Sequence, residues 1–477
     1  MMILILLFLY FLGAIATYSV GDKWASKVAL GFSALAFGWF IFFLAPAANI
    51  TLIHNWFSNP NVQLALQLDG LAKVMLFLTT GLAPIIILSS YKSAISNAKG
   101  FYTLVLIMLG AMCGTFLASD GFLYYIFWEL SLLPIFLIGL VWGNNENKLR
   151  RKTIMKFFVY TFASSLFMLA SLIFLYTKTN SFYLTDLYAV DLTFNEQVWV
   201  FLGFFFAYAV KIPIIPFHTW QAQTYTLSPT VGTMLLSGIM LKMGLYSVIR
   251  WQMPIAPQAA QELAPFVIFL CIAGVIYGSI LALKQTNLKT FLAYSSLAHV
   301  GLIAAGIYSG TFDGMLGAVL QMVAHGFVIV GLFYAVDIIE DRYKTIQIPE
   351  LGGIRSWAPK FTSLFMILMV ASVGLPGTFN FVGEFTILYG LSTVSICYAI
   401  FGGLSIILGA YYMLKMFQKV MLGSAFDKPF ADVNLFESVV LILIIGALIY
   451  FGLYPKYISD LASSSINIIF NQINSVK

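Results

Sequence analysis

The feature that most constrains the fold is a succession of long apolar blocks along almost the whole chain. The blocks are about 17 to 25 residues long, the length at which an α-helix crosses the roughly 30 Å hydrocarbon layer of a bilayer. Strands are shorter runs of about 4 to 8 residues, so the block length argues against barrels and sandwiches. Composition agrees, because the chain is 61% hydrophobic and only 9% charged. We therefore predict an all-α integral membrane protein.

The hydropathy pattern predicts about fourteen transmembrane helices. The first is expected to be retained, because residues 2–20 lack a basic leader and a cleavage pattern. The expected helices span residues 2–20, 28–47, 72–90, 101–118, 121–142, 153–176, 196–221, 229–250, 263–283, 289–308, 312–337, 360–390, 395–417 and 433–453.

Basic residues are distributed very unevenly between the two sets of loops. Loops after even-numbered helices hold only Lys178 and Arg250. Loops after odd-numbered helices hold Lys23, Lys27, Lys92, Lys99, Lys148, Arg150, Arg151, Lys152, Lys284, Lys289, Arg342, Lys344, Arg355, Lys360, Lys419 and Lys428. By the positive-inside rule, both termini are expected on the outer side of the membrane. The net charge of +6 therefore reflects topology, and nucleic acid is not an expected partner.

Several charged residues fall inside the predicted helices, where a charge near the bilayer centre costs about 2.5 to 3.5 kcal/mol. A lysine near a helix end can extend to the surface, as we expect for Lys73 and Lys156. Lys211, Lys242 and Glu384 have long apolar stretches on both sides and should face a polar interior instead. The full set is Lys73, Glu129, Lys156, Lys211, Lys242, Glu384 and Lys415. This set predicts a proton or ion path.

An internal period links these charges. Glu129 precedes His299 by 170 positions, and Lys156 precedes His325 by 169. The pairs Lys211 with Glu384 and Lys242 with Lys415 are each 173 apart. This nearly constant offset superposes the fourth to eighth helices on the ninth to thirteenth, and since five is odd, the copies must cross the membrane in opposite directions. The pattern predicts two inverted five-helix repeats, an architecture of ion transporters.

The seventh and twelfth helices are expected to be broken. Pro213 and Pro216 interrupt the first, and Pro376 stands between Gly374 and Gly377 in the second. Each proline removes a backbone donor and clashes with the preceding turn. Interruptions in corresponding segments of two halves point to a binding site. The alternative is an ordinary proline kink without a transport role.

The histidines and cysteines are the residues that a cofactor could use. His218, His299 and His325 fall in predicted helices and could carry protons, since histidine titrates near neutral pH. Two helical histidines could instead hold a haem, and His218 could be merely structural. Three cysteines, Cys113, Cys271 and Cys397, show no CxxC spacing, so they support neither a zinc nor an iron–sulfur site. No redox cofactor of its own is expected for this chain.

Together, these motifs resemble the antiporter-like, proton-translocating membrane subunits of respiratory complex I, in particular the M type. The matching segments are Phe127-Trp128-Glu129, Lys156-Phe157-Phe158, Val210-Lys211-Ile212-Pro213, Pro216-Phe217-His218, Ser296-Leu297-Ala298-His299, His325-Gly326, Gly374-Leu375-Pro376-Gly377 and Asn380 to Glu384. After Trp220 the chain departs from the family pattern, because an acid and a histidine common there are missing. The departure puts a proton entrance at that loop in doubt.

The resemblance implies a role for each buried group. Glu129 would pair with Lys211, and Lys242 with the histidines would connect that pair to a terminal group. The terminal group is Glu384 here, as in the M type, whereas sister subunits have lysine. A further set of residues would support this relay, namely Lys156, His218, Pro213, Pro376 and Lys415.

The resemblance thus implies a proton-translocating subunit of NADH:quinone oxidoreductase in the inner membrane, with NADH, FMN, iron–sulfur clusters and quinone bound by other subunits. The expected regions are three N-terminal helices (1–100), two repeats (101–252 and 253–421) and a last helix with a tail (422–477). Other membrane-arm subunits and the lipid bilayer are the expected partners. Alternatives are a subunit of a multi-chain sodium/proton antiporter or of a membrane-bound hydrogenase, a structural spacer, and a direct quinone enzyme.

Overall fold

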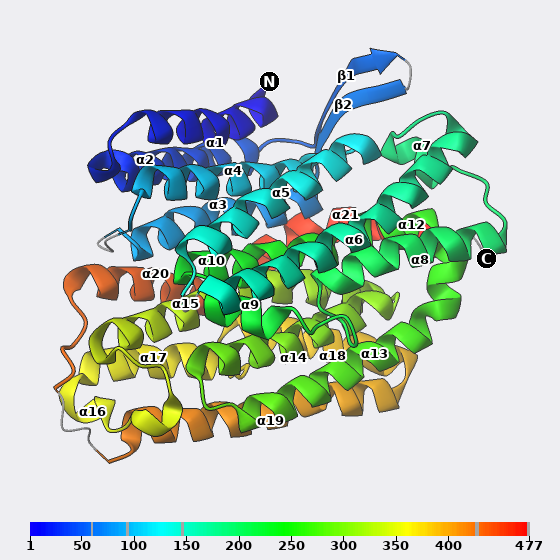
Figure 1. Ribbon diagram of the computed structural model, residues 1–477. Helices are drawn as coiled ribbons and strands as arrows, with labels where there is room; N and C mark the ends of the chain where they lie inside the picture. The colour runs from blue at the N-terminus through cyan, green and yellow to red at the C-terminus, as the bar shows by residue number, and fades with distance from the viewer. Residues whose placement is uncertain (59–60, 92–94, 145–146, 425–428, 475–477) are drawn as a thin grey trace.

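The computed structural model describes residues 1–58, 61–91, 95–144, 147–424 and 429–474. Long helices lie side by side and run across the view in Figure 1. Twelve helices among the described residues are long and apolar enough to cross a membrane. The prediction of an all-α membrane protein is confirmed. Of the basic loop residues, Lys92 and Lys428 lie outside the described residues.

The twelve spans correspond to twelve of the fourteen predicted helices. They are α1 (Met2–Ser19), α2 with a π-helical end (Asp22–Leu44), α3 (Gly70–Ser89), α4 (Ala98–Leu117), α5 (Gly121–Trp142), α6 (Asn147–Thr179), α10 to α12 (Thr230–Ile255), α13 (Pro257–Lys284), α14 (Leu288–Tyr308), α15 (Phe312–Tyr343), α19 with a π-helical end (Ile396–Leu422) and α20 (Leu435–Leu453). Within the span Thr230–Ile255, α10 is Thr230–Leu235, α11 is Leu241–Ser247 and α12 is Met253–Ile255, joined by π-helical turns.

The other two predicted spans are broken, as expected. The seventh consists of α8 (Phe194–Lys211) and α9 (Gln221–Leu227), separated by residues 212–220, here named the first break. The twelfth consists of α17 (Pro359–Ser372) and α18 (Phe379–Val394), separated by residues 373–378, the second break. Prolines in both breaks cannot donate to the helical ladder, which explains why the helices stop there.

Polar side chains at the helix starts explain where several spans begin. The Asp69 carboxylate accepts a hydrogen bond from the Ala72 amide at the start of α3. Asp120 accepts from Phe122 and Leu123 at the start of α5. Such caps satisfy amides that have no partner within the helix. These two acids therefore have a local structural role.

Several elements were not predicted. Strands β1 (Ile50–Ser58) and β2 (Asn61–Leu68) form an antiparallel hairpin that projects at the upper right of Figure 1. Helix α21 (Lys456–Asn474) occupies most of what was expected to be a tail. The short helices α7 (Leu184–Tyr188) and α16 (Ile354–Trp357) were also missed. All of them are too short or too polar to resemble a membrane span, so a search for long apolar blocks passes over them.

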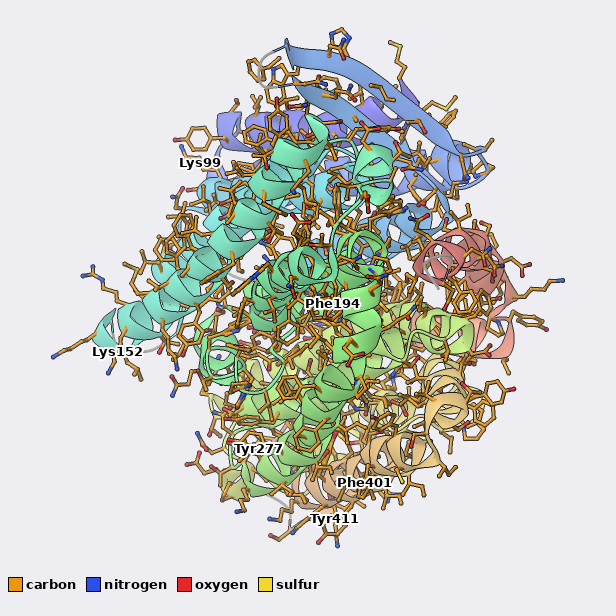
Figure 2. All side chains as sticks on the ribbon, turned by 90° about the vertical axis from the view of Figure 1, so that its right-hand side faces the viewer. Lys99, Lys152, Phe194, Tyr277, Phe401 and Tyr411 are labelled. Atoms are coloured by element: carbon orange, nitrogen blue, oxygen red, sulfur yellow. The ribbon has the colours of Figure 1, made fainter. Side chains whose placement is uncertain are left out.

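The interior of the bundle is formed by the span from α10 to α12, with α14 and α15 beside it. Residues 231–255 are all buried, so this span has no face toward lipid. Large side chains such as Phe401 and Tyr411 on α19 are exposed, and both lie toward the lower edge of Figure 2. Charged residues on the central span must therefore find partners within the protein.

Candidate functional site

The centre of the site is a pair of basic side chains from two adjacent helices. Lys242 on α11 is completely buried, and its Nζ lies 2.9 Å from Nδ1 of His325 on α15. The same ammonium donates to the Ser237 carbonyl oxygen at 2.5 Å. Ser237 belongs to the π-helical turn Leu236–Met240, which immediately precedes α11. The pair can pass a proton directly, because an imidazole nitrogen can act as donor or acceptor.

A second pair lies beside the second break. His299 Nδ1 on α14 is 3.0 Å from Glu384 Oε1 on α18. Gln321 on α15 donates to the same carboxylate oxygen at 3.1 Å. Glu384 is 1% exposed, so these contacts replace its hydration. The structure therefore agrees with the expectation that Glu384 lies in a polar interior.

Gly374 gives the Glu384 carboxylate room to approach the second break. A Cβ at Gly374 would lie 2.7 Å from Glu384 Oε2. Gly374 also has φ +76°, a conformation that residues with a side chain rarely adopt. The glycine is thus required both by the backbone and by the position of the carboxylate.

The two pairs are close to each other. The imidazole rings of His299 and His325 have centroids 5.9 Å apart. His325 Nε2 is buried and has no hydrogen-bond partner among the described residues. A single water between the rings could join them. Lys242, His325, His299 and Glu384 therefore form one buried series that crosses from the first half of the chain to the second.

Glu129 and Lys211 form the other acid–base pair, beside the first break. The Lys211 ammonium lies 4.7 Å from the centroid of the Trp128 ring, next to Glu129 on α5. The two charges are near enough to influence each other, although no ion pair within 4 Å joins Glu129 and Lys211 among the described residues. Glu129 Oε1 is buried without a hydrogen-bond partner among the described residues. This oxygen is available to a water or a proton.

Lys211 packs against the same helix that carries the central lysine. A Cβ at Gly244 would lie 3.4 Å from Lys211 Cβ, and Gly244 is two residues from Lys242 on α11. No hydrogen bond joins the two lysines among the described residues. A proton moving between them would need intervening water.

Four other predicted residues lie outside this series. Lys156 donates to the Thr219 carbonyl oxygen in the first break at 3.1 Å, and the His218 ring packs edge-on against Tyr277. Pro213 and Pro376 lie in the two breaks. Their positions suit support of the breaks rather than direct transfer.

Two lysines are not where the sequence suggested. Lys415 is exposed, with its ammonium 5.4 Å from the centroid of the Tyr411 ring, so the structure does not bring it to the buried series. Lys73 was expected to extend to the surface. It is buried instead, and it donates to the Ala47 carbonyl oxygen. The chain between α2 and β1 supplies that acceptor, so the Lys73 ammonium has a hydrogen-bond partner without reaching water.

Sequence reasoning missed Gln321, Ser237 and the steric role of Gly374. Gln321 precedes His325 by four residues on α15, so helical spacing places both on one face. That spacing was a usable signal. The contact made by the Ser237 carbonyl has no side-chain signature and could not have been found.

The chain matches a known family over more than half of its length. A profile of the NADH:quinone oxidoreductase/Mrp antiporter transmembrane family matches residues 118–409. The chain belongs to this family. It is 38% identical over 428 residues to NADH-quinone oxidoreductase subunit M of Rickettsia conorii, covering 88% of this chain and 86% of that relative. The region that matches the family includes both acid–base pairs and the central lysine.

Solved structures share the fold over nearly the whole chain. Respiratory complex I from Thermus thermophilus contains a chain with TM-score 0.92 and 27% identity, covering 99% of this chain and 100% of that one. The Mrp complex from Dietzia contains a chain with TM-score 0.85 and 17% identity, covering 99% of this chain and 98% of that one. At that identity, the second similarity concerns the fold alone.

Proposed function

We propose that this chain is the M-type proton-translocating membrane subunit of a NADH:quinone oxidoreductase. The observation that carries the proposal is the buried series of Lys242, His325, His299 and Glu384, whose members lie within hydrogen-bonding or single-water reach. Several ionisable groups in an apolar bundle are costly, and such groups mark paths for ions or protons. The 38% identity to a relative named subunit M supports the choice of complex.

In the proposed mechanism, Glu129 controls the charge of Lys211. A carboxylate near a buried lysine favours the charged ammonium, and burial favours the neutral amine. A change in the position or charge of Glu129 would therefore load or unload Lys211. Lys242, His325 and His299 relay a proton through water, and Glu384 releases it toward the outer side.

The arrangement of the pairs supports two inverted repeats within residues 101–252 and 253–421. Glu129 and Lys211 correspond to His299 and Glu384 at the repeat offset. Each half therefore contributes one acid–base pair beside one helix break, with the positions of acid and base exchanged. The Lys242–His325 contact connects the halves. Residues 1–100 and 422–477 flank the repeats in this division.

The proposal assigns the redox chemistry to other subunits. NADH, FMN, iron–sulfur clusters and quinone would bind there, and the membrane-arm subunits would be the partners of this chain. The resemblance to NADH:quinone oxidoreductase subunits supports an inner-membrane location, and the distribution of basic loops supports a position of both termini on the outer side. Protons would then move outward as quinone is reduced elsewhere in the complex.

Purification of the tagged chain from its native membrane tests the proposal. We expect co-purification of flavin, iron–sulfur clusters and NADH:quinone oxidoreductase activity. The fold shared with an Mrp chain makes an antiporter subunit the alternative. Recovery of a flavin-free complex that exchanges sodium for protons would contradict the proposal and favour that alternative.

A further inference from the structure

A cavity of about 790 Å³ opens at the end of the bundle that carries Lys344. Its walls come from α3, α4, α5, α10, α15, the start of α20 and the loops beside them. Four carboxylates line it, those of Asp337, Glu340, Asp341 and Glu437. Because basic loops mark this end, the positive-inside rule makes it the cytoplasmic end.

Three of the four carboxylates are neutralised by a cation. Glu340 pairs with Lys289 at 2.6 Å, Asp341 with Lys344 at 3.0 Å, and Glu437 with Arg342 at 2.6 Å. Asp337 has no ion-pair partner within 4 Å among the described residues. Its Oδ1 instead accepts a hydrogen bond from the Thr230 hydroxyl. The charges of Lys289, Glu340 and Asp341 also act on Asp337 at longer range.

Asp337 and Thr230 lie on the same two helical segments as the central proton pair. Thr230 precedes Lys242 by 12 residues, and Asp337 follows His325 by 12 residues. At 1.5 Å per residue, the two pairs are about 18 Å apart along both segments. The contact between the span α10 to α12 and the antiparallel helix α15 therefore holds two polar pairs. Thr230–Asp337 lies at the cavity, and Lys242–His325 lies at the centre of the bundle.

Hydroxyl groups lie between the two pairs. The Ser237 hydroxyl donates to the Thr233 carbonyl oxygen at 2.8 Å, and the Ser237 carbonyl accepts from Lys242. Thr230, Thr233 and Ser237 are spaced by three and four residues, which places them on one helix face. That face leads from the cavity toward Lys242.

We infer that Asp337, held by Thr230, is the cytoplasmic loading site from which protons reach Lys242, an inference that rests on the proposed function. The Asp337 carboxylate takes a proton from cavity water and becomes a neutral acid. It then gives that proton to water on the inner side, and the proton passes along the hydroxyl-lined face to the Lys242–His325 pair. The missing acid and histidine after Trp220 are not needed on this route.

Cysteine labelling tests access to the loading site without measuring transport. Cys113 and Cys271 are buried and Cys397 is exposed, so Cys397→Ser provides the background. In the assembled complex, Asp337→Cys should react with a charged, membrane-impermeant methanethiosulfonate added on the cytoplasmic side only. The matched control Val330→Cys, about two turns deeper on the same helix, should not react from either side. Failure of Asp337→Cys to react, or reaction from the outer side, would overturn the inference.

Proton pumping tests the role of the carboxylate. Asp337→Asn should lower NADH-driven pumping by roughly tenfold or more in assembled complexes, and Asp337→Glu should restore most of it. Asp313→Asn, in the first turn of the same helix and away from the cavity, should pump normally. If Lys242→Met stops pumping but Asp337→Asn does not, the assignment of Asp337 as the loading site is refuted and the proposed function stands. If neither variant affects pumping, the proposed function fails as well.

Discussion

Replacement of Lys242 by methionine should separate stability from transport. The ammonium is completely buried and has two partners, the Ser237 carbonyl oxygen and His325 Nδ1. Its two charge-assisted hydrogen bonds contribute about 1.5 to 3 kcal/mol each. Burial of the charge costs several kcal/mol, which methionine avoids. The opposing contributions are similar, so the free energy of unfolding should change by about 2 kcal/mol or less.

Transport should respond much more strongly, because loss of a positioned proton carrier lowers a rate by about 10²-fold or more. Lys242→Arg should also stop pumping, since arginine keeps its charge and does not release its proton. Quenching of a pH-sensitive dye by sealed vesicles supplied with NADH measures pumping, and the amount of assembled complex measures stability. Wild-type pumping by Lys242→Arg would mean that the residue is only a fixed charge. A large loss of assembly in Lys242→Met would refute the stability argument.

Other contacts lead to three more predictions. Glu129→Gln should assemble normally but suppress coupled pumping, and a normal proton-to-electron ratio would refute its role. Gly374→Ala should impair pumping more than Gly377→Ala, because both glycines have positive φ but only Gly374 faces the Glu384 carboxylate; equal effects would contradict the steric argument. Asp69→Asn should destabilise the protein by about 3 kcal/mol, because Arg250, 2.5 Å away, would lose its partner in a buried ion pair. Thermal unfolding measures this loss, and an unchanged midpoint would show that the ion pair contributes little.

Hydropathy and proline positions were sufficient to predict the spans and both breaks. The physical reason is that each span must satisfy its backbone within an apolar layer, which requires a long apolar helix. The hairpin and α21 were not predicted, because neither is a long apolar helix of the kind that a membrane span requires. Strand β2 alternates in part, with Val62, Leu66 and Leu68 buried on one side and Ala65 buried on the other, and α21 buries Ile458, Ile466 and similar residues along one face. Both signals are periodic patterns within short segments, which a search for long apolar blocks does not detect.

The candidate site was predictable to the extent that it consists of ionisable side chains. Lys242, His325, His299 and Glu384 were chosen for their charge or titration in apolar surroundings, and the structure brings them together. Their pairing across the two halves depends on tertiary packing and had no local signature. Lys415 shows that the repeat offset alone does not predict burial. It corresponds to Lys242 in the repeat, but it is exposed because its helix lies at the periphery of the bundle.

The most direct test of the central claim is the proton-to-electron ratio of assembled complexes with Glu384 replaced. Glu384 accepts from Gln321 and contacts His299 at the end of the buried series. Glu384→Gln keeps the shape of the side chain and removes its ability to carry a proton, whereas Glu384→Lys restores a titratable group. We expect a ratio well below wild type for Glu384→Gln and partial recovery for Glu384→Lys. A wild-type ratio in Glu384→Gln would contradict the account.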